Sequence, residues 1–150
     1  MRKTSAYARR RRHIDPLAGL RRLDMARQFD PGDTTEQHIK TRAAFERLEN
    51  GTADNDDFDR VAMAINLAKI RALEIDRALA DLLEAGQEAM TAVRNRNTKW
   101  AKWDVLPAER TAIVEALDAH EAITDASSPL QMHEALDVVR RSVLANMRKA

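Results

Sequence analysis

The segment most informative about the fold is NDDFDRVAMAINLAKIRAL, at residues 55–73. Its apolar residues return every three or four positions, which is the period of an α-helix. They form two stripes, one made of Phe58, Val61, Ile65, Ala68 and Ala72, the other of Met63, Leu67 and Ile70. A helix that is apolar on two sides is usually buried among its neighbours. We therefore predict that residues 55–73 form the central helix of an all-α protein.

The sequence on both sides of this stretch predicts more helices. Apolar spacing, together with start and stop residues, gives helices over residues 15–28, 34–49, 76–93 and 107–126, and from Pro129 onward. Asp30-Pro31-Gly32-Asp33 has the composition of a loop, and Asn50-Gly51 that of a helix end. The central helix either ends near residues 74–76 or continues into the next one, and the sequence leaves both options open. Gly86, inside a predicted helix, indicates a close approach of another helix.

Ser128-Pro129-Leu130-Gln131 is the sharpest local signal in the chain. It matches a capping box with proline at the first helical position. Because about two residues join it to the preceding helix, we expect the last two helices to form a C-terminal antiparallel helical hairpin. The predicted fold is an all-α bundle of five to six helices with a flexible basic N-terminal arm. An elongated helical dimer is the alternative architecture, since several helices carry wide apolar stripes.

Composition limits the class of protein. The 150 residues are 44% apolar and 33% charged, with four glycines, which suits one helical domain over residues 15–150 preceded by an arm at residues 1–14. The absence of cysteine excludes disulfides, thiolate metal sites and a cysteine nucleophile. No apolar run reaches the roughly 18 residues that a membrane span requires, so we expect a cytoplasmic protein.

Charge is unevenly distributed along the chain, although the net charge is only +1. Residues 1–27 carry a net charge of +7, whereas residues 28–93 carry −7. The arm holds Arg2, Lys3, Arg9, Arg10, Arg11 and Arg12. Arginine makes forked, charge-assisted hydrogen bonds to phosphates, so this arm is a candidate nucleic-acid contact. A merely solubilising tail is the alternative interpretation.

A second basic segment alternates cationic residues with tryptophans. It belongs to a predicted linker over residues 94–106. Its candidate nucleic-acid contacts are Arg94, Arg96, Lys99, Trp100, Lys102 and Trp103. In such segments the cations can bind the phosphate backbone while the rings stack on bases. The alternative is that both tryptophans plug the end of the bundle, since large aromatic side chains are usually well buried.

No catalytic or metal-binding set stands out, so we predict a protein that is not an enzyme and needs no cofactor. His120-Glu121 and His133-Glu134 each lack the second histidine of a zinc-protease motif, and His120 reads as a histidine at the edge of the core. The acids Asp54, Asp56, Asp57 and Asp59 lack the glycine and glutamate of a calcium loop. Capping of a helix N-terminus explains them more simply.

Several segments resemble a group of small helical proteins of bacterial phages and prophages. They are ERLENGTADNDDFDRVAMAINLAKI at residues 46–70, EAGQEAM at 84–90, the basic tryptophan segment, ALDAHEAITDASSPLQMHEALDVVRR at 116–141 and the opening MRKTSAYARRRR. Members are sometimes labelled Fis-like regulators. The last predicted helix carries its bases, Arg140 and Arg141, late rather than in the first turn that enters a DNA groove. The resemblance implies a phage or mobile-element setting and supplies no activity and no site residues.

Two functions follow as hypotheses. The first is a non-enzymatic phage or prophage accessory protein that binds nucleic acid through the arm and the Lys/Trp segment. The alternative is a phage-encoded inhibitor or modulator of a host complex, acting against host defence or on a polymerase, whose acidic middle meets a basic host protein. A small enzyme ranks last. Nucleic acid, a host protein and a second copy of the chain are the partners considered, and no membrane is expected.

Overall fold

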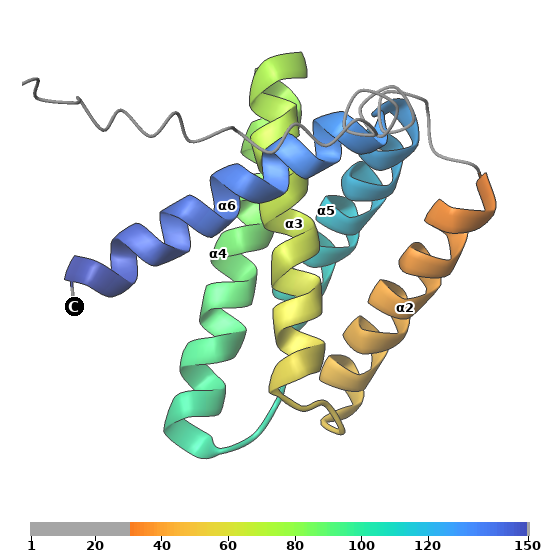
Figure 1. Ribbon diagram of the computed structural model, residues 1–150. Helices are drawn as coiled ribbons and strands as arrows, with labels where there is room; N and C mark the ends of the chain where they lie inside the picture. The colour runs from red at the N-terminus through yellow and green to blue at the C-terminus, as the bar shows by residue number, and fades with distance from the viewer. Residues whose placement is uncertain (1–30, 150) are drawn as a thin grey trace, which may run out of the picture.

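The computed structural model describes residues 31–149 (Figure 1). The predicted arm at residues 1–14 and the predicted helix at residues 15–28 lie outside the described residues. The helices are α2 (Pro31–Asn50), α3 (Asn55–Ile75), α4 (Arg77–Trp100), α5 (Pro107–Ala126) and α6 (Pro129–Lys149). The rest of the described chain is connections, and residues 31–149 contain no strand. The all-α helical bundle is confirmed.

The predicted central helix is the central helix of the bundle. α3 packs against α2, α4, α5 and α6, and Figure 1 shows it among them. The stripe that includes Val61, Ile65 and Ala68 is fully buried, and its neighbours in the core include Leu48 of α2, Leu83 of α4 and Ile113 of α5. The second stripe, through Met63 and Leu67, is only half-buried.

Two helix boundaries depend on single residues. α2 begins at Pro31, so the predicted loop at residues 30–33 is wrong from Pro31 onward; proline is pre-organised for the first helical position. Asp76 alone separates α3 from α4, because its backbone is extended (φ −158°, ψ 127°). Its N–H donates to the Ala72 carbonyl at 2.8 Å, and its carboxylate accepts from the Ala78 N–H at 3.0 Å. The helix therefore breaks where the sequence left the question open.

α4 is longer than predicted. It runs to Trp100, so the predicted linker at residues 94–106 is wrong over its first seven residues. No glycine or proline interrupts residues 94–100, and Arg94 and Arg96 find partners on the body of the bundle. The helix ends at Ala101, which adopts a left-handed backbone (φ 52°, ψ 35°) and donates its N–H to the Asn97 carbonyl at 2.7 Å.

α6 takes a direction that the sequence did not predict. The capping box is present: the Ser128 N–H donates to Gln131 Oε1 at 2.9 Å, and the Gln131 N–H donates to Ser128 Oγ at 3.2 Å. Yet α6 does not run back along α5 as a hairpin; it crosses α3 (Figure 1). The physical reason is that α4 and α3 already cover the apolar face of α5, whereas Ala135 and Val139 of α6 are buried. The predicted antiparallel hairpin is thus corrected to a crossing helix.

Among the helices of residues 31–149, none combines the length and apolar character that crossing a membrane requires.

Candidate functional site

The predicted basic segment lies at the C-terminal end of α4 and in the connection to α5. Arg94, Arg96, Lys99 and Trp100 are on the last two turns of α4, and Lys102 and Trp103 follow in the connection. The structure divides these residues into a group that joins α4 to its neighbours and a group that faces solvent. The predicted contacts Arg2, Lys3, Arg9, Arg10, Arg11 and Arg12 lie outside the described residues.

Arg96 belongs to the first group. Its guanidinium donates to both carboxylate oxygens of Glu109, at 2.5 and 3.1 Å, and to the Asp104 carbonyl at 2.7 Å. Glu109 also accepts the Leu106 N–H at 2.9 Å, so it caps α5 while it holds Arg96. Burial, the largest single influence, raises the pKa of Glu109, but the hydrogen bonds from Arg96 and the Leu106 N–H, together with the charge of Arg96, outweigh it and hold that pKa below its ordinary value. Arg96 therefore joins α4 to the start of α5, and its guanidinium is engaged by Glu109 and Asp104 rather than free to bind a phosphate.

Trp103 also belongs to the first group. Its ring stacks on Phe58 of α3, with centroids 5.3 Å apart and planes 17° apart, and only 7% of the residue is exposed. The guanidinium of Arg94 lies 4.9 Å from the centroid of the same Phe58 ring. Trp103 plugs the end of the bundle, and this corrects the expectation that its ring stacks on a base.

The second group consists of Lys99, Trp100 and Lys102, which we call the Trp100 tip. Trp100 is 67% exposed, and the Lys99 ammonium lies 5.0 Å from the centroid of its ring. Lys99 and Lys102 are exposed too. The interpretation as a bundle plug therefore holds for Trp103 and fails for Trp100, whose ring remains open to a partner.

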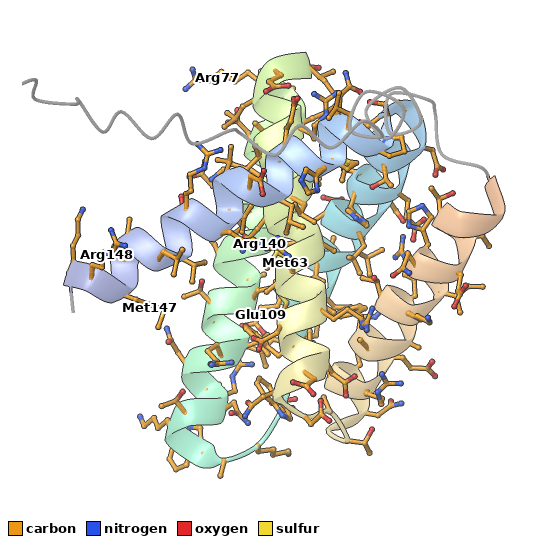
Figure 2. The ribbon with its side chains drawn as sticks, viewed as in Figure 1. Met63, Arg77, Glu109, Arg140, Met147 and Arg148 are labelled. Carbon is orange, nitrogen blue, oxygen red and sulfur yellow. The ribbon has the colours of Figure 1, made fainter. Side chains whose placement is uncertain are left out.

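A second exposed surface lies at the end of α6. All residues from 142 to 149, the α6 extension, are exposed, and they include Val143, Leu144 and Met147, at 49%, 56% and 71% exposure. Val143 and Met147 continue the stripe that Val139 begins against α3. Figure 2 shows Met147 and Arg148 on the part of α6 that projects past the other helices. Basic residues flank this apolar strip, and no part of the described chain covers it.

Two histidines from separate helices meet inside the bundle. His38 of α2 and His120 of α5 make an edge-to-face contact, with ring centroids 5.6 Å apart and planes 86° apart. His120 is 8% exposed, which agrees with its predicted place at the edge of the core. Burial is the main reason why the pKa of His120 falls from 6.5 to about 4, and the neighbouring His38 lowers it further. His120 is therefore uncharged at neutral pH.

His38 and Thr124 were not predicted as site residues from the sequence. Thr124 follows His120 by one helical turn, a spacing that places both on one face of α5 and could have drawn attention to it. His38 has no comparable local signal, because the residues around it come together only through the packing of α2 on α5. Asp125 of α5 lies 3.2 Å from His38 Nε2.

The acidic cluster at the start of α3 contains the cap of this helix, as predicted. The Asp57 N–H donates to Asp54 Oδ1 at 2.9 Å, and the Asp54 N–H donates to Asp57 Oδ2 at 3.2 Å. Arg47 of α2 donates to both oxygens of Asp57, at 2.5 and 3.0 Å, and these bonds are the main cause that lowers the pKa of Asp57. Within residues 31–149, no three histidine or acidic residues come together in a way that could hold a metal ion.

Comparisons of the chain with models of known protein families, with curated proteins and with solved structures find no match.

Proposed function

We propose that this protein is a non-enzymatic accessory protein of a phage or prophage that binds nucleic acid through its basic arm and the Trp100 tip. The observation that carries the proposal is the exposed ring of Trp100 beside two exposed lysines. Large aromatic side chains are usually well buried, so a tryptophan that is 67% exposed is unusual. Its ring is available to stack on a base.

The charge of the chain supports the same proposal. The arm adds six cations within residues 2–12, and Lys99 and Lys102 add two at the tip. Cations of this kind neutralise phosphates and release counterions, which makes binding strongly dependent on salt. The acidic stretch at residues 28–93, with its net charge of −7, repels nucleic acid and confines contact to the basic regions.

The test is a salt series of binding to fluorescent duplex DNA, single-stranded DNA and RNA. The full chain is compared with three variants: Arg9–Arg12 all changed to serine, Lys99→Glu with Lys102→Glu, and Trp100→Ala. Log affinity is expected to fall linearly with log salt, and each removed phosphate contact lowers the slope by about 0.7 to 0.9. Trp100→Ala should weaken single-stranded binding about tenfold while leaving the slope unchanged, because it removes stacking and no charge.

Arg77→Glu is the matched control, because Arg77 is exposed at the opposite end of α4 (Figure 2). It reverses one charge away from the tip, where the Lys99 and Lys102 variant reverses two, and its affinity should stay close to that of the unchanged protein. Absence of binding to all three nucleic acids near physiological salt would contradict the proposal. Equal losses per reversed charge in the Arg77 and tip variants would show that only overall charge matters.

The α6 extension favours a second candidate, an inhibitor or modulator of a host complex. Exposed Val143, Leu144 and Met147 form an apolar strip of the kind that a protein partner covers. Nuclease-treated pull-downs with the full chain and with Leu144→Glu plus Met147→Glu would test it. The candidate requires a host protein that the full chain captures and the double variant does not. Sedimentation of the purified full chain and the purified variant tests whether the strip instead joins two copies of this chain. In that case the full chain would be a dimer and the variant a monomer.

A further inference from the structure

A cavity of about 440 Å³ lies beside the middle of α3, lined by residues of α2, α3 and α5 and by Met132 of α6. Figure 2 labels Met63, which marks its level on α3. Met63, Ala64, Leu67 and Met132 give it mainly apolar walls. Small-molecule sites in proteins commonly measure roughly 300 to 1,000 Å³. The cavity therefore has room for a ligand with an apolar body.

Within residues 31–149, three polar atoms of the cavity residues are buried without a hydrogen-bond partner. They are His38 Nδ1, His120 Nδ1 and Thr124 Oγ1. His120 and Thr124 are each only 8% exposed. Thr41, on the α2 wall, differs because its hydroxyl donates to the Gln37 carbonyl at 2.9 Å. Buried polar atoms are nearly always paired in folded proteins, so three unpaired ones on residues that line one cavity are unusual.

The contact between His38 and Asp125 determines which hydrogen-bonding group of a ligand can pair with His38. Its Nε2 lies 3.2 Å from Asp125 Oδ1, and a carboxylate only accepts, so Nε2 carries the hydrogen. In the neutral ring, Nδ1 then bears a lone pair and no hydrogen. The ligand must therefore present an N–H or O–H group to His38. Thr124 can donate or accept, so a second polar atom of either kind suits it.

The charges around the cavity argue against an anionic ligand. His120 is uncharged at neutral pH because its burial lowers its pKa. Two acids, Asp56 and Asp59, line the cavity against one base, Arg60. A phosphate or carboxylate would gain no net attraction here. The two methionines favour aromatic rings, since sulfur makes favourable contacts with them.

We propose that this cavity binds an uncharged heteroaromatic molecule of nucleobase or nucleoside size, which donates an N–H hydrogen bond to His38 Nδ1 and pairs its other polar atoms with His120 and Thr124. Such molecules carry donors and acceptors side by side on the edge of a flat ring. The site lies on other residues than the Trp100 tip, so it goes beyond the proposed function and does not depend on it.

The test is titration of the full, ¹⁵N-labelled chain with adenosine, cytidine and uridine, followed by NMR of the backbone amides and the imidazole nitrogens. At least one nucleoside should shift the imidazole signals of His38 and His120 and the amide of Thr124, in a saturable way, at concentrations up to millimolar. The matching nucleoside 5′-monophosphate should bind more weakly, because its phosphate meets Asp56 and Asp59.

Three variants identify the site. Thr124→Val keeps the side-chain volume and removes the hydroxyl, and His38→Leu removes the acceptor. Each should raise the dissociation constant about tenfold, as expected for a lost hydrogen bond to a buried group. His133→Leu makes the same change as His38→Leu on the exposed His133 of α6, outside the cavity, and should leave affinity unchanged. If His38→Leu fails to fold, Thr124→Val still decides the question.

Two results would overturn the proposal. The first is that no nucleoside shifts the cavity signals. The second is that a nucleoside binds with equal affinity to the unchanged chain and to Thr124→Val, which would place it elsewhere. A parallel titration with Zn²⁺ interprets the first result: if Zn²⁺ perturbs both imidazoles where no nucleoside does, the pair of histidines serves a metal ion.

Discussion

Gly86 of α4 lies against Ala116 of α5 so closely that a Cβ atom at residue 86 would overlap the Ala116 Cβ. The Ala112 carbonyl oxygen would stand 3.5 Å from the same atom. The close helix approach that the sequence indicated at Gly86 is therefore present, and α4 and α5 share the most extensive helix contact of the described chain.

Gly86→Ala should destabilise the protein, although alanine is the better helix former by about 1 kcal/mol. The added methyl must push α4 and α5 apart, which should cost about 3 kcal/mol, so the net loss in the free energy of unfolding should be about 2 kcal/mol. Urea denaturation measures it. Adding Ala116→Gly removes the overlapping atom, so the double variant should be more stable than Gly86→Ala alone. A fully stable single variant would contradict this packing.

Arg96→Met should cost about 2 kcal/mol in the free energy of unfolding, because it leaves the 13%-exposed side chain of Glu109 without its cation. Arg110→Met is the matched control. Its ion pair with Glu49 on α2 has a cation that is 59% exposed, and such pairs contribute less than about 1 kcal/mol. Equal losses in both variants, measured by chemical denaturation, would show that Arg96 is an ordinary surface cation.

The buried His120 makes stability depend on pH. Its pKa is about 4 in the folded protein and 6.5 ordinarily. Above pH 6.5 neither state is protonated and the residue has no effect. As pH falls from 6.5 to 4, only the unfolded state takes up the proton, so the free energy of unfolding drops by about 3 kcal/mol and then levels off.

Unfolding free energies of the full chain and of His120→Leu, measured across this pH range, isolate the effect. Both share the same carboxylates, so the difference between their pH slopes belongs to His120. His133→Leu, a change at an exposed histidine, should keep the steep slope of the unchanged protein. Parallel curves for the unchanged chain and His120→Leu would mean that His120 titrates normally.

Asp54→Ala should lower the free energy of unfolding by about 1 kcal/mol, because it removes the side chain that caps α3. Asp56→Ala removes a neighbouring acid of the same first turn whose contribution is limited to the helix dipole, a few tenths of a kcal/mol. Thermal unfolding of the two variants side by side distinguishes a specific cap from general negative charge. Equal shifts would contradict the assignment of Asp54.

Features that depend on neighbours along the chain could be predicted from the sequence alone. The 3.6-residue period located α3 and placed it at the centre, and residues such as Ser128 and Gln131 marked the start of α6. These signals are local, because a helix bonds residues four apart and a cap bonds residues three apart. Such local signals can be recognised in a sequence wherever the pattern is complete. For this reason the all-α class, the break before α5 and the role of Asp54 could be predicted.

The choice of which helix packs against which became visible only in the folded protein. It directed α6 across α3 instead of along α5, extended α4 to Trp100, buried Trp103 on Phe58 and brought His38 to His120. Each outcome depends on contacts between residues distant in the chain, where several apolar faces compete for the same partner. Periodicity shows that a helix has a face to bury, but the choice of partner comes from the packing of all helices together.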